Sequence, residues 1–436
     1  MRTILPFLKS FSEFAERIGT FEALRHRNYR YLWLGTAAFS SGYWVQQVVV
    51  GWLAYEITGS ALITSIALGL DALPVLLGAP LGGLLTDRFD KKKLLIATPI
   101  YCSLLMTSYF FVVHYGYTSA WNLFLLVFLA GLSWIIHDPA RMALLAQIVP
   151  KENLVNAFAL NSMAFSVTRL MMPAIGGLLI ALLGPAPLFL LEALLLGITA
   201  IIIMFIKIES NGQSPTSTPL QSISSGLKDG ISYVLGNRAL IGLTTMNLGM
   251  AIMVIPFVNG LLPVYAVEVY SVGPEGLGLL LSAAGVGSFV GTFILASFSN
   301  IARPGKVLFG FLGMMGILMA LFGFNDRYFI ALGLMMIVSG CMMSFFSVGG
   351  ATVQRILDDK YRGRATGIFM MTWGFMPIGS LAAGILAAEF GASNSTYLGS
   401  ITLAVFIVVC FYTFKDVWEY KHSPTISPNY LTLTGN

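Results

Sequence analysis

The sequence predicts an all-α membrane protein in which twelve transmembrane helices form two six-helix bundles. Three observations lead to this prediction: the composition, the number of long apolar runs, and a polar stretch that divides the runs equally. Of the 436 residues, 56% are hydrophobic and 10% are charged, whereas a typical soluble domain has about 25% charged residues. Water cannot solvate a surface with so few charges, so most of this surface must face lipid.

The apolar runs give the number of expected helices. A helix needs about 20 apolar residues to cross the hydrocarbon core of a bilayer. Twelve runs of suitable length are present: 31–55, 61–85, 94–115, 121–146, 154–183, 188–206, 241–267, 276–299, 307–324, 328–353, 365–389 and 396–414.

The longest polar interruption, from Lys207 to Arg238, separates the first six runs from the last six. Its first half is rich in Ser, Thr and Pro, which is typical of a linker, and its second half has an apolar stripe at helical spacing. We therefore expect an N-terminal bundle over 31–206, a cytoplasmic linker over 207–240, a C-terminal bundle over 241–414 and a cytoplasmic tail over 415–436.

Residues 1–30 form a separate segment that does not have the pattern of a cleavable signal peptide. Five apolar side chains recur at alternating steps of four and three, which is one face of a helix. We expect a cytoplasmic amphipathic helix that lies on the membrane surface. The residues on this face are Phe7, Phe11, Phe14, Ile18 and Phe21.

The orientation follows from the basic residues, which accumulate in cytoplasmic loops. With the N-terminus inside, every one of the 25 lysines and arginines except Arg169 and Arg327 falls in an inner segment. Both termini are therefore expected in the cytoplasm of a multi-pass protein of the cell inner membrane. The formal net charge of +5 is spread over short loops, so it does not indicate nucleic-acid binding.

The loop between the second and third runs carries a recognisable motif. It reads Gly83-Leu-Leu-Thr-Asp87-Arg88-Phe-Asp90-Lys91-Lys92. This resembles the loop signature of the major facilitator superfamily, Gly-x-x-x-Asp-Arg-x-Gly-Arg-Lys, with Asp90 in place of the second glycine.

The resemblance implies a gate at the cytoplasmic side. Asp87 would meet the positively polarised start of helix eleven, here Gly363-Arg364, and Gly83 would let another helix approach closely. The alternative is a basic loop that only fixes the topology.

Other segments narrow the resemblance to one bacterial branch of the superfamily, which contains siderophore (enterobactin-type) exporters and macrolide efflux pumps. These segments include Arg27-Asn-Tyr-Arg30, Trp52-Leu-Ala-Tyr55 and Arg362-Gly-Arg364, and the likeness extends from about residue 25 to 414. The resemblance implies export from the cytoplasm but does not name a substrate.

The fifth run contains Pro173-Ala-Ile-Gly176-Gly177. This resembles the end of the antiporter signature of drug exporters, Gly-Pro-x-x-Gly-Gly, with Met172 in place of the first glycine. An equally good interpretation is a helix kink with close packing against a neighbouring helix.

Charged residues inside the runs are candidates for coupling, because each is costly in lipid unless it is paired or faces water. Asp71 lies about 15 Å along the second helix, near the bilayer centre, and Arg169 lies at a similar depth. We expect Asp71 either to exchange a proton or to be the structural partner of Arg169 or of another group. His137 and Asp138 are further candidates, or else they form an inner-end cap with Arg141.

The remaining acids within or beside the runs lie near outer helix ends, where an interfacial carboxylate is ordinary. These are Glu56, Glu192, Glu268 and Glu389.

The resemblance places helices one, four, seven and ten around a central cavity. These helices offer aromatic, Met-rich and amide side chains, which suit bulky amphipathic ligands. The cavity candidates are Trp44, Gln46, Gln47, Trp134, Asn247, Asn259, Phe345 and Phe346.

Taken together, these features predict a proton-coupled exporter of amphipathic small molecules, drug-like or siderophore-like, which works as a monomer by alternating access. The alternatives are an uptake or lipid-moving carrier of the same superfamily and a transport-dead membrane sensor or scaffold. No hydrolase, metalloprotease or nucleotide-binding motif is present, so we expect neither an enzyme nor an ATP-driven pump. We also expect no cofactor and no metal site.

Overall fold

The protein is described from a computed structural model over residues 22–207, 221–297, 301–358 and 361–420. Within these ranges every regular element is a helix. The expected surface helix at the N-terminus, up to residue 21, and the first part of the linker, residues 208–220, lie outside the described residues.

The elements follow one another along the chain with short connections. They are η1 (Glu22–Arg25), α2 (Arg27–Thr58), α3 (Ala61–Gly69), η2 (Leu70–Ala72), α4 (Leu73–Arg88), α5 (Lys91–His114), α6 (Ala120–Ile148), η3 (Lys151–Asn153), α7 (Leu154–Leu183), α8 (Ala186–Met204), α9 (Gln221–Leu235), α10 (Arg238–Met253), α11 (Ile255–Val258), α12 (Leu262–Val264), η4 (Tyr265–Val269), α13 (Pro274–Ala296), α14 (Pro304–Phe324), α15 (Tyr328–Ile356), α16 (Arg362–Met371), η5 (Thr372–Phe375), α17 (Met376–Phe390), α18 (Ala392–Thr413) and α19 (Lys415–Glu419).

Ten described helical segments are long and apolar enough to cross a membrane. The first two expected runs are not among these ten. The first lies within α2, a single helix of 32 residues, and the second is divided between α3 and α4, with a shorter apolar helix over Ala61–Leu76.

Local sequence sets many of the helix ends. Asp90 accepts a hydrogen bond from the Lys93 amide and caps the start of α5. Ser119 accepts a hydrogen bond from the Asn122 amide in a capping box at the start of α6. Gly59 ends α2 in a left-handed conformation with φ of 57°, which glycine adopts without steric cost. These short signals explain why the loops between long helices are so brief.

Three of the expected spanning helices are interrupted in their middle parts. A 3₁₀ turn at η2 separates α3 from α4, and another at η5 separates α16 from α17. The segment from α10 to η4 is broken around Asn259. Prolines at positions 74, 256, 263 and 377 follow or lie within these breaks, and each removes a backbone donor that a continuous helix would need.

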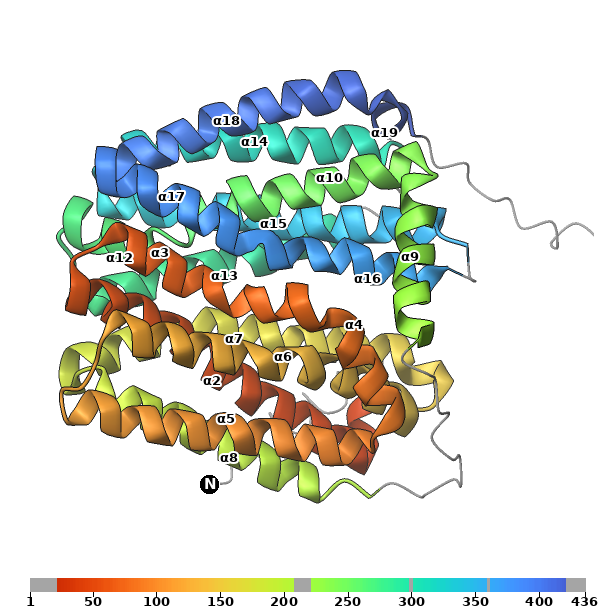
Figure 1. Ribbon diagram of the computed structural model, residues 1–436, viewed down its shortest axis with the longest axis horizontal. Helices are drawn as coiled ribbons and strands as arrows, with labels where there is room; N and C mark the ends of the chain where they lie inside the picture. The colour runs from red at the N-terminus through yellow and green to blue at the C-terminus, as the bar shows by residue number, and fades with distance from the viewer. Residues whose placement is uncertain (1–21, 208–220, 298–300, 359–360, 421–436) are drawn as a thin grey trace, which may run out of the picture.

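Helices from the two halves of the sequence lie roughly parallel, with α10, α14, α15, α17 and α18 on one side and α2, α5, α6, α7 and α8 on the other (Figure 1). The halves meet through α7 against α13, α3 against α17, and α4 against α16. Helix α9 crosses the ends of the helices at the right of Figure 1 and contacts both α4 and α16.

Candidate functional site

Asp71 lies in the 3₁₀ turn that interrupts the second membrane segment. The turn forms because Pro74, at the second position of α4, cannot donate a hydrogen bond back to Leu70. Gly131 of α6 makes room for the exposed backbone here, since a Cβ atom at Gly131 would come within 2.5 Å of the Asp71 carbonyl oxygen. Irregular backbone at this depth in a membrane occurs where it is buried in protein or lines a water-filled cavity.

The Asp71 carboxylate is held from α2. Gln47 Nε2 donates to Asp71 Oδ2 at 3.2 Å and the Tyr43 hydroxyl donates to the same oxygen at 3.5 Å. The other oxygen, Oδ1, is buried and has no hydrogen-bond partner. One oxygen of Asp71 is therefore anchored by neutral donors, while the other can accept a proton or a water molecule.

Arg169 does not pair with Asp71 in this structure, since no described acid lies within 4.0 Å of its guanidinium nitrogens. Its guanidinium instead lies over the ring of Trp44, with Cζ 5.1 Å from the ring centroid. A cation on an aromatic face is worth about 0.5–2 kcal/mol, more where water is excluded. The two charged residues therefore have different first contacts, Tyr43 and Gln47 for Asp71 and Trp44 for Arg169.

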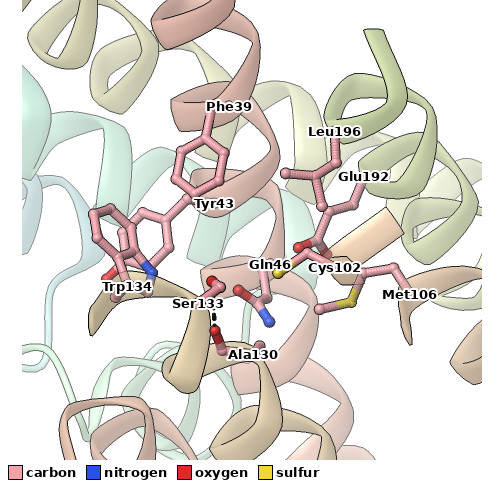
Figure 2. A pocket seen from close by; sticks show the side chains of 10 residues that line it. All are labelled: Phe39, Tyr43, Gln46, Cys102, Met106, Ala130, Ser133, Trp134, Glu192 and Leu196. Atoms are coloured by element: carbon pink, nitrogen blue, oxygen red, sulfur yellow. Dashed lines mark hydrogen bonds between the residues drawn. The ribbon is translucent and has the colours of Figure 1, made fainter. Parts of the chain in front are cut away.

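A small cavity lies between α2, α5, α6 and α8, and Figure 2 shows the side chains that line it. Its volume is about 20 Å³, which is enough for one water molecule. Tyr43, Gln46 and Trp134 form part of the wall. The Trp134 ring meets Tyr43 edge-on at 4.9 Å between centroids, so α2 and α6 contact each other here.

Glu192 also lines this cavity, which differs from the expectation of an interfacial carboxylate. It lies on α8, its side chain is 2% exposed, and its Oε2 atom has no hydrogen-bond partner. In Figure 2 the carboxyl group points into the cavity beside Cys102 and Gln46. Helix α8 begins six residues earlier, at Ala186, so Glu192 lies about 9 Å along the helix, well away from its end.

The other three acids of that group are placed differently. Glu56 and Glu389 are exposed, as expected of residues near helix ends. Glu268 accepts a hydrogen bond of 2.7 Å from the Tyr55 hydroxyl. This contact joins α2 to η4, and therefore links the two halves of the chain near the ends of these helices.

His137 and Asp138 are engaged in packing and pairing on α6. The His137 ring is buried, stacks on Phe39 at 3.7 Å between centroids, and its Nδ1 lies 2.9 Å from the Thr98 hydroxyl oxygen. Asp138 forms an ion pair with Arg141 one turn later. These contacts correspond to the structural alternative considered for the two residues.

The candidates in the C-terminal half have different surroundings. Asn247 of α10 is buried and donates to the Phe369 carbonyl oxygen and the Thr372 hydroxyl, at 3.2 and 2.6 Å. Asn259 lies in the break after α11, and its Oδ1 is buried without a partner. Phe345 is 2% exposed, and Phe346 packs edge-on against Trp373 at 4.9 Å.

The Pro173-Gly176-Gly177 motif on α7 faces the other half of the chain. A Cβ atom at Gly177 would lie 3.0 Å from the Gly278 Cα of α13, and one at Gly278 would lie 3.1 Å from the Gly177 Cα. The Ala174 amide, next to Pro173, donates to the Ser282 hydroxyl at 2.9 Å. Gly176 points elsewhere, with its nearest neighbours at 3.8 Å. The motif therefore permits close contact between α7 and α13.

The loop with the gate motif lies between α4 and α5. Asp90, the residue that departs from the signature, is the N-terminal cap of α5, a role that glycine fills less well. Lys92 donates to the Met204 carbonyl oxygen at the end of α8, at 2.9 Å, Lys91 opens α5, and Arg88 is half-buried at the end of α4.

The expected partner of the loop is the start of α16, whose first residues include Gly363 and Arg364. Helix α4 contacts α16. The surroundings of Gly83, the Asp87 side chain and Gly363 lie outside the described part of the structure. Arg364 forms an ion pair of 2.9 Å with Asp229 of α9, and Tyr233 of α9 stacks on Tyr361 at 4.5 Å.

A bundle of apolar membrane helices, with interrupted helices around a buried carboxylate, defines a polytopic membrane transporter of the major facilitator class. The family model described as transmembrane secretion effector matches residues 18–429. The chain belongs to this family.

Several relatives are efflux proteins. The chain is 23% identical over 386 residues to macrolide efflux protein A of Streptococcus pyogenes, covering 87% of this chain and 94% of the relative. It is 24% identical to the staphyloferrin A transporter of Staphylococcus aureus, covering 85% and 92% of the two chains. It is also 24% identical to the multidrug efflux pump Tap of Mycolicibacterium fortuitum, covering 80% and 87%.

Solved structures share the fold at low sequence identity. A bacterial homolog of the human lysosomal transporter Spinster, in an inward-facing and unoccupied conformation, superposes with a TM-score of 0.71 at 14% identity, covering 91% of this chain and 99% of that chain. The nucleoside transporter NupG superposes with a TM-score of 0.70 at 13% identity, covering 91% and 100%.

Proposed function

We propose that this protein is a proton-coupled exporter of amphipathic small molecules, and that it works by alternating access between two halves of six spanning helices each. In this proposal both termini lie in the cytoplasm, the monomer is the working unit, and the membrane is the bacterial inner membrane. Macrolides and siderophore-like molecules are the first substrates to test, because relatives along most of the chain carry those names.

The observation that supports the proposal best is the environment of Asp71. A carboxylate at this depth is costly unless it is paired, wet or protonated, and no described cation pairs with Asp71. Its anchoring by Tyr43 and Gln47 leaves Oδ1 free. A carboxyl group in this setting can bind a proton when its surroundings are dry and release it when water enters.

The interrupted helices support alternating access. Breaks at η2 and η5 face each other, since a Cβ atom at Gly374 in η5 would contact Leu76 just after η2. Helices of two halves that rock against each other around a midplane site are the general mode of secondary transporters with repeated halves. The breaks provide positions where backbone dihedral angles can change without disrupting a whole helix.

The direct test is accumulation of radiolabelled erythromycin and of ethidium in inside-out membrane vesicles with an acidic interior. We expect at least one of the two probes to accumulate in the vesicles. The accumulated probe should leave the vesicles when nigericin collapses the pH gradient. Vesicles that lack the protein provide the control. Accumulation that persists after nigericin would contradict proton coupling. Accumulation only in right-side-out vesicles would show that the protein imports the probe instead of exporting it.

A further inference from the structure

Glu192 is a buried acid that the proposed mechanism does not yet use. It lies on α8 and packs against α2 at Gly42, where a Cβ atom would be in ordinary van der Waals contact with Glu192 Cγ at 3.5 Å. The carboxyl group points into the 20 Å³ cavity.

The surroundings of Glu192 contain no compensating cation. No described lysine, arginine or histidine lies within 4.0 Å of its carboxylate, and Oε2 has no hydrogen-bond partner. Removing one partner of a buried charge pair is strongly destabilising, so an ionised Glu192 without any partner would be equally unfavourable. A protonated Glu192 carries no charge and needs only one acceptor for its O–H group.

On the helices near Glu192, the neighbouring side chains are either neutral or already bound to another side chain. Cys102 on α5 and Tyr43 on α2 line the same cavity. On α6, His137 is bound to Thr98 and Asp138 to Arg141. The charged residue of α7 in this region is Arg169, which lies over Trp44.

A second small cavity lies next to Asp71. It has a volume of about 10 Å³ and is lined by Gln46, Gln47 and Asp71, among others. Gln46 lines both cavities and its side chain is 9% exposed. Glu192 and Asp71 therefore line two separate small cavities that share the Gln46 side chain in their walls.

We propose that Glu192 is a second proton-binding carboxyl group, linked to Asp71 through Gln46 and the water that the two cavities can hold. This inference rests on the proposed proton coupling for its role in transport, but the binding of a proton at Glu192 can be measured without transport. A proton would move from one carboxyl oxygen to water and from water to the other carboxylate, so that charge and atoms are conserved.

The experiment uses the purified full-length protein and the apolar reagent dicyclohexylcarbodiimide, which modifies protonated carboxyl groups in apolar surroundings. The extent of modification at each acid is measured by peptide mass spectrometry over a range of pH. We expect an adduct at Glu192 that decreases as the pH rises and is absent in Glu192→Gln. A water-soluble carbodiimide should modify exposed Glu389 and spare Glu192.

The link to Asp71 has its own measurement. If the two carboxyl groups are linked as proposed, they titrate as a coupled pair, and a negative charge on Asp71 opposes ionisation of Glu192. In Asp71→Asn the midpoint of Glu192 modification should therefore move to lower pH. An unchanged midpoint would show that the two acids are not linked.

Infrared spectroscopy of the unmodified protein keeps the test valid even if Glu192→Gln folds poorly. The carbonyl stretch of a protonated carboxyl group should disappear at high pH in the unsubstituted protein. Glu192 that stays unreactive at every pH, while Asp71 reacts, would overturn the proposal. If Glu192 reacts as expected but vesicle accumulation is independent of the pH gradient, the proton site stands and the proposed coupling fails.

Discussion

At the scale of single residues, Asp71 and Arg169 show that two charged residues at similar predicted depth along their helices need not form an ion pair. Counting residues along the helices predicts that both lie inside the membrane-spanning region. It does not give the rotation of each helix about its axis, and that rotation directs Arg169 to Trp44 and Asp71 to Gln47. An ion pair that is inferred from equal depth therefore has to be checked against the way the helices pack.

Asp71→Asn should abolish transport driven by a pH gradient while substrate binding and exchange without a gradient survive. The amide keeps the size of the side chain and its bond to Gln47, but it cannot titrate. Transport is measured in vesicles with and without the gradient, and exposed Glu56→Gln is the control. Wild-type gradient-driven transport in Asp71→Asn would exclude Asp71 as the proton carrier.

The same substitution also separates the structural role from the coupling role. Because Arg169 has no contact with Asp71 in this structure, Asp71→Asn should leave the yield of folded protein unchanged. The effects of Asp71→Asn and Arg169→Gln on stability should add within about 0.5 kcal/mol, as for independent sites. A low yield for the single variant that is restored in the double variant would instead demonstrate a structural pair.

Asp87→Asn should impair transport much more than it lowers the amount of protein in the membrane. A carboxylate at a helix N-terminus is worth about 0.3–1 kcal/mol, which is too little to unfold the protein but enough to shift a balance between two conformations several-fold. The matched control is Asp90→Asn, in the same loop, because Asn caps a helix as well as Asp does. Equal transport in the two variants would show that the loop only sets the topology.

At the scale of helices, composition and apolar run length predict an all-helical membrane protein, but they do not predict the breaks within the helices. Each of the twelve runs overlaps described helices, and Pro74 follows the break beside Asp71. Glu192 looks interfacial from the sequence because the apolar run that contains it is expected to begin only at residue 188. Its burial depends on the packing of α8 against α2, which a single sequence does not show.

The close contact of α7 and α13 predicts different outcomes for two adjacent glycines. Gly177→Ala would place a methyl group against the Gly278 backbone and should destabilise the protein by about 1–3 kcal/mol. Gly176→Ala meets only ordinary contacts at 3.8 Å and should be neutral, or stabilising by up to about 1 kcal/mol through helix propensity. Thermal unfolding of both variants in detergent measures the difference.

Transport by the same two variants distinguishes packing from a dedicated antiport role. If the motif acts through packing, Gly176→Ala should transport like the unsubstituted protein while Gly177→Ala loses activity along with stability. Loss of transport in both variants, with normal thermal stability in both, would favour the antiporter interpretation of the motif.

At the scale of the whole molecule, the halves are joined near both ends of their helices. Tyr55 and Glu268 form a hydrogen bond at one end, and α9 contacts α4 and α16 at the other. Alternating access requires these two sets of contacts to open in turn. The ion pair between Asp229 and Arg364 is about half exposed on both sides, so it can break at little cost when the α9 end opens.

The orientation of the molecule can be tested with single cysteines. Because basic residues accumulate on the cytoplasmic side, and only Arg327 lies in an expected outer loop, the connection between α5 and α6 should face outwards. Cys102, Cys341 and Cys410 are first replaced by Ser. We then expect Tyr117→Cys, at a side chain that is 75% exposed, to react with a membrane-impermeant maleimide added to intact cells.

Two positions serve as inner controls for that experiment. Lys151→Cys, at an exposed residue of η3, and a cysteine placed within 210–220 should react with the impermeant reagent only after the cells are opened, although a permeant maleimide should label them in intact cells. Labelling of Lys151→Cys and protection of Tyr117→Cys in intact cells would reverse the orientation. Export would then require the opposite vesicle polarity, and the α9 end of the molecule would face the outside.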